Sequence, residues 1–294
     1  MGLKTSLFRF RTRKVQSLEK KEDILSDKEL IDLWSQCPYC KAMIYNDELK
    51  KNLRVCPKCN HHFRMNSYER IEQLIDAGTW EELNNNIKTA NPLNFVDIKA
   101  YSNRIEEAKK QSGTSEAIIT GVGNIYGQRT SLAVMEFSFL GGSMGSVVGE
   151  RICRSIEYSI ENKLPLIIIS SSGGARMHEG LFSLMQMAKT SSSLQKLRQA
   201  KLLYISVLAD PTYGGVSASF ATLGDIIIGE PGAKIGFAGP RVIEETIRQK
   251  LPKDFQTAEY LLEHGQLDLV IDRHNLKNKL FQLIKMHNSS KGTS

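Results

Sequence analysis

The chain has 294 residues, of which 41% are hydrophobic and 24% are charged, and its formal net charge is +7. These values predict a globular protein with one large domain, or with a large domain and a small appendage. No apolar run approaches the roughly 18 residues that span a bilayer, and the basic N-terminus lacks the apolar stretch of a signal peptide, so we expect a cytoplasmic protein without a membrane span.

The positive charge is concentrated at the start of the chain. Residues 1–70 hold 15 Lys and Arg against 9 Asp and Glu, so +6 lies there and only +1 remains for the other 224 residues. This asymmetry indicates a separate N-terminal unit that meets something anionic, or else a solvated basic surface. We predict a basic arm with a short helix over residues 1–33, a cysteine-rich unit over 34–66 and the main domain over 67–294.

Four of the five cysteines stand in two C-x-x-C pairs separated by fifteen residues, Cys37, Cys40, Cys56 and Cys59. Two such turns bring four thiolates to one tetrahedral ion, and zinc(II) suits a closed, sulfur-only site. We therefore predict one structural Zn²⁺, against a redox pair, an Fe–S cluster or unmetallated thiols. With four thiolates available, His61 and His62 are expected to be surface residues, and Cys153 a small buried hydrophobe.

The main domain is predicted to begin with helices and then to alternate strands with helices. In chain order, the first elements are the helices Ser67–Ala77 and Ile98–Lys110 and the strands Ala117–Thr120, Val122–Ile125 and Leu132–Phe139. They are followed by helix Ser146–Asn162, strand Leu164–Ser170, helix Ala175–Gln199, strand Leu202–Leu208, helix Val216–Leu223 and strand Ile226–Ile228. The chain closes with the helices Pro240–Gln249, Thr257–His264 and Leu276–Met286. This alternation predicts an α/β fold.

Two Gly-Gly pairs, Gly173-Gly174 and Gly214-Gly215, each follow an apolar strand and precede a predicted helix. Residues without side chains at a helix N-terminus expose backbone N–H groups and let a ligand approach closely. Such donors can hold the oxygen of a developing enolate. We predict that the two pairs are backbone oxyanion donors, with packing or a plain turn as the alternative.

Side-chain catalysts are harder to identify. A serine hydrolase set can be named from Ser172 or Ser217, His178 and Asp210, but the G-x-S-x-G elbow is missing, so this reaction class is disfavoured. Arg176 falls in the first turn of a predicted helix beside a glycine pair, where a cation is disfavoured. It is therefore a candidate for binding a phosphate or carboxylate, against the alternative of a solvated arginine.

Several motifs together resemble the β subunits of bacterial acetyl-CoA carboxylase carboxyltransferases. Besides the cysteine pairs, they are FLGGSMGSVVGERI (139–152), SSSGGARMHEG (170–180), SLMQMAKTSS (183–192), DPTYGGVSASFATLGD (210–225) and IGFAGPRVIEET (235–246). The resemblance implies a crotonase/ClpP-like ββα spiral core with an N-terminal four-cysteine zinc ribbon. It also implies transfer of a carboxyl group from carboxybiotin to acetyl-CoA, giving malonyl-CoA for fatty acid synthesis.

The same resemblance implies partners and site residues. It implies an α subunit in an α2β2 heterotetramer, biotin on a separate biotin carboxyl carrier protein, and a biotin carboxylase that uses ATP in the holoenzyme. It maps the enolate-stabilising pair onto Gly214-Gly215 and places Gly173-Gly174-Ala175 in the other loop facing the thioester, with Ala175 and Arg176 near the substrate. The general base is then the ureido nitrogen of biotin rather than a side chain.

Two other functions stay open. Arg54, Lys58 and Arg64 make the surroundings of the cysteines basic, as in a zinc-ribbon nucleic-acid-binding regulator; nucleic-acid binding is also possible as a secondary activity. A stand-alone crotonase-type acyl-CoA hydratase or decarboxylase would instead work without a partner.

Overall fold

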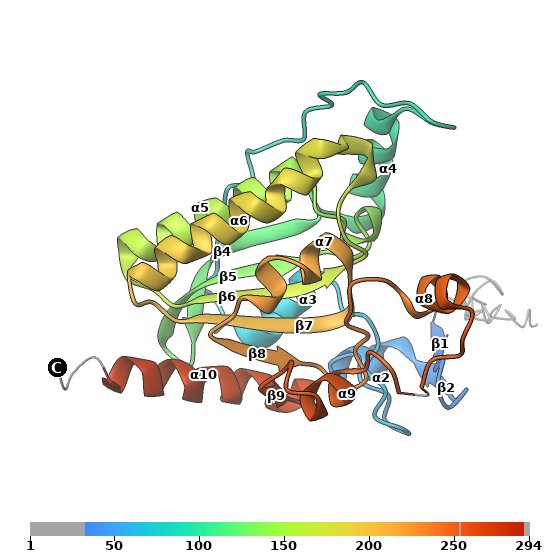
Figure 1. Ribbon diagram of the computed structural model, residues 1–294. Coiled ribbons are helices and arrows are strands. Elements are labelled where there is room, and N and C mark those ends of the chain that lie inside the picture. Colours follow the sequence, from blue (N-terminus) through green and yellow to red (C-terminus); the bar gives the residue numbers. More distant parts are fainter. Residues whose placement is uncertain (1–32, 253, 291–294) are drawn as a thin grey trace, which may run out of the picture.

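The computed structural model describes residues 33–252 and 254–290, with the side chains of 289 and 290 left out. The predicted arm and short helix of residues 1–33 lie outside the described residues, except for residue 33. The described part consists of a small N-terminal unit and a larger α/β body built around a seven-stranded sheet (Figure 1).

The small unit contains the two cysteine pairs. Its strands β1 (Trp34–Gln36) and β2 (Met43–Tyr45) pair antiparallel, and the short helix α2 (Asn46–Lys51) follows them directly. A second antiparallel contact joins Val55 to His62 on either side of the second cysteine pair. Each cysteine pair therefore lies at the tip of a short hairpin, as the C-x-x-C spacing predicts.

The large sheet has the order β3-β4-β5-β6-β7-β8-β9. The first three strands are antiparallel, and the rest join in parallel. The strands are β3 (Glu81–Leu83), β4 (Ile118–Ile125), β5 (Gln128–Met135), β6 (Leu166–Ser172), β7 (Tyr204–Thr212), β8 (Ile226–Gly229) and β9 (Leu269–Val270). Because β6 and β7 are parallel neighbours, the loops that leave their carboxyl ends lie side by side.

Helices cover both faces of this sheet (Figure 1). α5 (Ser146–Asn162) and α6 (Leu181–Gln199) pack on one face, and α3 (Ser67–Leu74) and α10 (Arg273–Ser290) on the other. Within β6, Ile168 belongs to the first apolar cluster, whereas Ile167 and Ile169 belong to the second. Burial on both faces explains why this strand is a continuous apolar run in the sequence.

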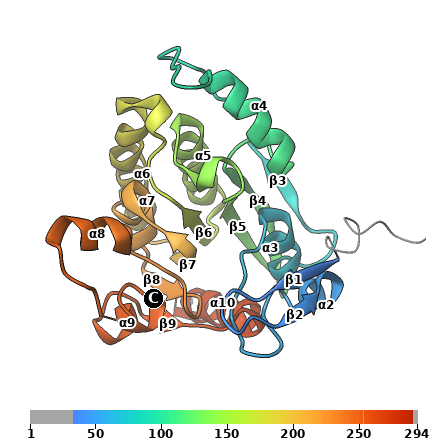
Figure 2. The same ribbon diagram turned by 90° about the vertical axis from the view of Figure 1, so that its right-hand side faces the viewer.

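The remaining helices lie around the carboxyl ends of the parallel strands. They are α4 (Tyr101–Ser112), α7 (Gly214–Ser217), α8 (Pro240–Ile247) and α9 (Ala258–Glu263), with single 3₁₀ turns at Leu140–Gly142, Met177–Glu179 and Phe220–Thr222. α4 and α8 lie on separate margins of the molecule (Figure 2). None of the described helices combines the length and the apolar character needed to cross a membrane.

The element types agree with the sequence analysis, but several bounds differ. The two strands predicted around Gly121 form the single strand β4, where a Cβ at Gly121 would lie 2.3 Å from the Glu81 carbonyl oxygen. Glycine thus admits the close neighbour β3 instead of breaking the strand. The helix predicted from Ala175 begins only at Leu181, because Gly180 with φ 51° and ψ −128° interrupts the helical conformation. The predicted helix Val216–Leu223 is replaced by α7 and a 3₁₀ turn.

Candidate functional site

The four cysteines of the small unit form a compact cluster. Their sulfur atoms all lie within 4.8 Å of one another, and the Cys37–Cys59 and Cys40–Cys56 sulfur pairs are both 3.7 Å apart. Four sulfurs at the usual Zn–S distance of about 2.3 Å stand about 3.8 Å apart in a tetrahedron. The geometry therefore fits one closed Zn²⁺ site and leaves no position for a catalytic water.

The ionisation of these thiols also favours a cation. Burial alone would raise the pKa of Cys37, but backbone N–H groups of Cys40 and Tyr39 and neighbouring thiols bring it to about 7. Burial and the other three cysteines raise the pKa of Cys59 to about 12. The neighbouring thiols thus oppose full ionisation of the cluster, which a divalent ion bound to the sulfurs would offset.

A buried cluster of charged residues joins the ribbon to the α/β body. Arg273, at the start of α10, donates to the backbone carbonyls of Leu53 and Phe63 at 2.9 and 3.0 Å. The same guanidinium binds Glu230 with two hydrogen bonds, and Arg70 approaches that carboxylate at 2.7 Å. Bidentate arginine–carboxylate bonds fix orientation as well as distance, so the ribbon is held in one position on the body.

His62 adds a second contact and corrects one expectation. Its imidazole is buried and lies 3.0 Å from Asp272, although a surface position was expected. Burial lowers its pKa, despite the neighbouring carboxylates. His62 therefore serves the junction between ribbon and body and does not contribute to the metal cluster. Cys153 is buried, as expected.

The two glycine turns are in direct contact. Gly174 follows β6 with φ +123° and Gly214 follows β7 with φ +59°. A Cβ built on Gly214 would lie 3.0 Å from the Cα of Gly174, and one built on Gly174 would lie 3.2 Å from the Cα of Gly214. Only glycine at both positions allows this backbone contact and these conformations. The structure thus brings together the two turns that the sequence marks as candidates.

Three of the four N–H groups of the two glycine pairs donate hydrogen bonds within the protein. Gly173 donates to Gly141 O at 2.9 Å, Gly174 to Ser172 Oγ at 3.0 Å, and Gly214 to Phe237 O at 2.9 Å. These three N–H groups therefore have acceptors within the protein, and their role as oxyanion donors stays a prediction. In the part of the chain that the structure describes, no hydrogen bond is recorded from the N–H groups of Ala175 or Gly215.

Arg176 lies outside the helix in which it was expected. It precedes a 3₁₀ turn rather than lying in a helix, and its side chain is fully buried. Its guanidinium donates to Glu116, Glu179, Tyr101 and Ser143. A buried guanidinium with these partners is neither solvated nor available to a substrate anion.

The serine hydrolase set is not assembled. Ser172 Oγ lies against Gly174, Ser217 Oγ donates to the Gly236 carbonyl, and Asp210 accepts from the Lys234 N–H. The His178 ring stacks on Tyr101 with ring centroids 5.1 Å apart. Among the described residues, no hydrogen bond is recorded between any two of the four candidates.

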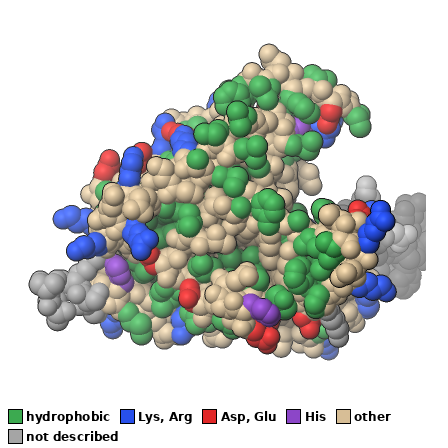
Figure 3. Space-filling model, viewed as in Figure 1, with side chains coloured by type: hydrophobic (Ala, Val, Ile, Leu, Met, Phe, Trp, Pro, Cys, Tyr) green, Lys and Arg blue, Asp and Glu red, His purple; other side chains and the backbone are tan. Residues whose placement is uncertain are grey.

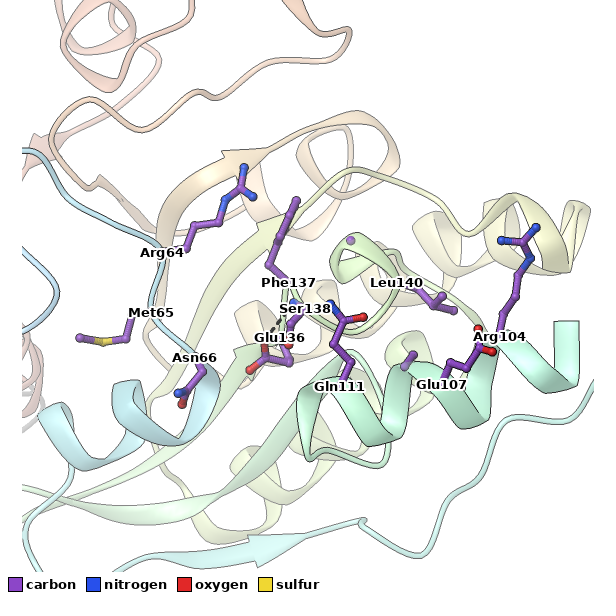
Figure 4. Close-up of a pocket in the computed structure, with 12 residues that line it drawn as sticks. Arg64, Met65, Asn66, Arg104, Glu107, Gln111, Glu136, Phe137, Ser138 and Leu140 are labelled. Atoms are coloured by element: carbon purple, nitrogen blue, oxygen red, sulfur yellow. Dashed lines mark hydrogen bonds between the residues drawn. The ribbon is translucent and has the colours of Figure 1, made fainter. Parts of the chain in front are cut away.

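A groove of about 600 Å³ lies beside the glycine turns, between the ribbon exit, the end of β5 and α4 (Figure 4). It includes Gly141, whose carbonyl holds Gly173. Arg64 and Arg104 stand at opposite ends, and the Arg64 guanidinium lies 4.0 Å from the centre of the Phe137 ring. The groove therefore has an arginine at each end and, between them, the Phe137 ring together with polar side chains such as Gln111 and Glu136.

An apolar surface also borders the site. Large exposed apolar side chains occur around the start of α6, and others on the loop before α8 and on α8 itself (Figure 3). They are Met177, Leu181, Phe182, Leu184, Met185, Phe237, Val242 and Ile247. No residue of α8 is buried in this chain alone. Extended apolar patches of this kind mark interaction surfaces.

Both parts of the chain, the ribbon and the α/β body, match known sequence families. Residues 62–264 match the carboxyl transferase domain family, and residues 34–59 match the acetyl-CoA carboxylase zinc finger domain. The chain is 55% identical to acetyl-coenzyme A carboxylase carboxyl transferase subunit beta of Acaryochloris marina, over 89% of this chain and 86% of that protein. It is 56% identical to the subunits beta/alpha protein of Clostridium tetani over 90% of this chain, but spans about half of that protein's length, 46%.

Solved structures with low sequence identity have the same fold. Transcarboxylase 12S superimposes with a TM-score of 0.63 at 23% identity, over 75% of this chain and 41% of that chain. A Pseudomonas malonate decarboxylase hetero-tetramer gives a TM-score of 0.61 at 22% identity, over 76% of this chain and 82% of that chain.

Proposed function

Because the chain belongs to the carboxyl transferase family, among the acetyl-coenzyme A carboxylase carboxyl transferase β subunits, we propose that it transfers a carboxyl group from carboxybiotin to acetyl-CoA. The family resemblance and the α/β fold with a four-cysteine ribbon, both expected from the sequence, are confirmed. The product is malonyl-CoA for fatty acid synthesis, and the proposed location is the cytoplasm. The division at residues 66 and 67 between ribbon and body stays a prediction.

The contact between the two glycine turns carries the catalytic part of the proposal. Ala175 and Gly215 have backbone N–H groups without a protein acceptor in the described residues, and they lie on two turns whose Gly174 and Gly214 touch. A Cβ built on Gly215 would be 3.3 Å from the Ala175 Cβ, so the two residues are direct neighbours. Two preorganised N–H donors are the arrangement that stabilises an enolate oxygen. We propose Ala175 and Gly215 as the donors.

No side-chain base is assigned here among the described residues: Ser172 and Asp210 are hydrogen-bonded to neighbouring residues, and the His178 ring is stacked on Tyr101. Carboxybiotin on a separate carrier protein would supply the carboxyl group and, after losing it, a basic nitrogen. This chain would bind the thioester, hold its enolate oxygen on two N–H groups and exclude water. The Zn²⁺ would be structural, held by the four cysteines.

The groove beside Gly141 is the proposed position for the non-reacting part of acetyl-CoA. Its Gly141 wall adjoins the Gly173 turn, which would place the thioester next to Ala175. The Phe137 ring and the Arg64 and Arg104 guanidinium groups suit a molecule that carries both a planar base and phosphates.

The apolar surface around α6 and α8 is the proposed interface with an α subunit, in an α2β2 heterotetramer. The Clostridium tetani relative carries beta and alpha subunits in one polypeptide, so the two halves work within one protein there. A helix such as α8, with exposed Val242 and Ile247 and no buried residue, needs another surface to cover its apolar side. The carrier protein and a biotin carboxylase would complete the enzyme.

The test is malonyl-CoA decarboxylation or carboxyl exchange with free biotin, for this chain alone and mixed with a candidate α subunit. We expect activity only in the mixture. Activity of the chain alone would instead identify a stand-alone crotonase-type enzyme, and inactivity in both with steep salt-dependent RNA or DNA binding would favour the nucleic-acid regulator.

A matched pair of variants tests the interface. Val242→Glu on α8 should abolish association with the α subunit and the activity of the mixture while leaving thermal unfolding of the isolated chain unchanged. Met286→Glu adds the same charge to an exposed apolar site on α10, 67% exposed, and should associate normally. Normal association of Val242→Glu would exclude this surface as the interface.

A further inference from the structure

The most fully connected buried side chain near the glycine turns is Arg176. Its Nη1 and Nη2 atoms bind both carboxylate oxygens of Glu116, and Nη1 also lies 3.4 Å from Glu179 and 3.1 Å from the Tyr101 hydroxyl. All three charged side chains are excluded from solvent. Breaking a buried pair of this kind leaves an uncompensated charge and is strongly unfavourable, so the arrangement is held firmly.

The two carboxylates belong to different parts of the molecule. Glu116 lies two residues before the start of β4, whereas Glu179 lies in the 3₁₀ turn that follows Arg176. Glu179 Oε2 accepts from the backbone N–H of Ser146 at 2.7 Å, which caps the start of α5. Tyr101, from α4, donates to Glu179 Oε1 at 2.7 Å. Arg176 thus links the segment before β4 and the helices α4 and α5.

Arg176 also joins the loop after β5 to the turn after β6. Its Nε and Nη2 atoms contact the Oγ and the backbone carbonyl of Ser143 at 3.2 and 2.8 Å. Two backbone bonds run alongside, from the Arg176 N–H to Met144 O and from the Met144 N–H to Gly174 O. Ala175 is therefore held between two residues that are both bonded to Met144.

From these contacts we propose that Arg176 is a positioning residue for the two N–H donors: it fixes Ala175 directly and Gly215 through the contact between Gly174 and Gly214. The catalytic consequence rests on the proposed function, whereas the positioning itself does not. Gly145 supports the arrangement, since a Cβ there would lie 2.8 Å from Arg176 Nη1 and 2.5 Å from Glu179 Oε1.

Charge and shape both require arginine at this position. Burial alone would raise the pKa of Glu116, but the Arg176 guanidinium and hydrogen bonds from Arg176, Thr89 and Ala117 hold it below its usual range. The Arg176 pKa is in turn raised, mainly by Glu116, against the effect of burial. A lysine ammonium carries the same charge but lacks the planar fork that binds both oxygens of Glu116 and reaches Ser143 at the same time.

The test compares Arg176→Lys with Arg70→Lys. Arg70 is a matched control, because it is also a buried arginine bonded to a buried glutamate, Glu230, but it lies on α3 at the opposite face of the sheet. Two quantities are measured: amide hydrogen exchange of the peptides spanning 172–177 and 213–217, and the kcat and KM of carboxyl exchange by the complex with the α subunit.

For Arg176→Lys we expect exchange in both peptides to rise about 10-fold or more, and kcat to fall by about 10- to 100-fold with KM within about threefold. Arg70→Lys should change neither, although its melting temperature falls. Equal effects of the two variants would mean that Arg176 contributes only to the general stability of the fold. Faster amide exchange with unchanged kcat would mean that the position of the turns does not affect the reaction. Either result overturns the proposal.

A second variant and a second measurement keep this experiment decisive. If Arg176→Lys does not fold, Tyr101→Phe is used, because it removes only the hydroxyl shared by Arg176 and Glu179; exchange and kcat should change in the same directions by a smaller factor. An unchanged Tyr101→Phe would then count against the proposal. If the wild-type complex shows no carboxyl exchange, the proposed function fails, while amide exchange still decides whether Arg176 holds the turns.

Discussion

Replacing Gly215 by proline or by alanine distinguishes the contribution of its backbone N–H group from that of its missing side chain. Proline removes the N–H, whereas alanine keeps it and adds only a Cβ. Gly215 is the second residue of α7, where proline is tolerated because the first helical N–H groups have no partner within the helix. Its φ lies outside the left-handed region, so the Cβ of alanine does not force a strained backbone.

The structure gives the expected magnitudes. An added Cβ would lie 3.2 Å from Met187 Sδ, 3.3 Å from the Ala175 Cβ and 3.5 Å from Met144 Cε. The methionine contacts can yield, since this side chain is flexible, so Gly215→Ala should lower kcat by less than about 10-fold, or ~1.4 kcal/mol. Loss of an oxyanion donor costs about 2.7–4 kcal/mol, so Gly215→Pro should lower kcat by about 10²- to 10³-fold.

The assay is malonyl-CoA decarboxylation by the complex with the α subunit, with zinc content and melting temperature measured on the same samples. Ser217→Ala serves as the neighbouring control. It loses the hydrogen bond from Oγ to Gly236 O, 2.7 Å, which costs about 1 kcal/mol of stability, and it should retain most of the turnover. A Gly215→Pro variant as active as Gly215→Ala, or less affected than Ser217→Ala, would refute the assignment of Gly215.

Three other perturbations have definite expected results. Cys56→Ser should release the metal and lower the melting temperature, because zinc–thiolate binding contributes on the order of 10 kcal/mol to such units; zinc content and proteolysis of residues 34–66 measure it. Arg64→Gln should raise the KM for acetyl-CoA about 10-fold, ~1.4 kcal/mol, with kcat nearly unchanged, since it removes one cation from the groove. Glu230→Gln should make the free energy of unfolding less dependent on pH in acid (the acid limb of the stability curve). Burial raises the pKa of Glu230, but the charges of Arg70 and Arg273 outweigh burial and hold this pKa below 4.5. A lowered folded-state pKa gives stability above pH 4.5 that is lost as the pH falls through that pKa, so the wild-type free energy of unfolding should fall more steeply in acid.

Each of these has an outcome that would contradict it. Full zinc occupancy in Cys56→Ser would mean that the fourth sulfur is dispensable. A fall in kcat with unchanged KM for Arg64→Gln would place this residue in the reaction instead of in substrate binding. Parallel acid limbs for Glu230→Gln and the wild type would show that the charge on Glu230 does not change on unfolding in that pH range.

The sequence predicted best those features that depend on local spacing. The separation of the cysteine pairs led directly to the four-sulfur cluster, and the period and length of the apolar pattern predicted α5 with its observed bounds, Ser146–Asn162. The two strand–glycine turns were also recognised, because glycine pairs after apolar runs are a local signal. Parallel pairing of β6 and β7 then brought these turns together.

Features that depend on distant partners could not be predicted in this way. The buried ion pair of Arg176 was not predicted because its principal partner, Glu116, is 60 residues away in the sequence. The same holds for the acceptor of the Gly214 N–H, the carbonyl of Phe237. The late start of α6 depends on a single glycine conformation at Gly180. Short elements such as β3 and β9 carry too few residues for a periodic pattern.

The way the ribbon is attached affects which substitutions it can accept during evolution. Arg273 binds the ribbon through main-chain carbonyl oxygens of residues 53, 54 and 63. Every amino acid offers the same carbonyl group, so that contact is indifferent to which side chains the ribbon displays. The outer face of the ribbon is free to accumulate substitutions, and hence to acquire new binding partners, without losing this contact. A ribbon transplanted from another protein would need the same backbone path at Arg273 and a side chain that meets Asp272 as His62 does.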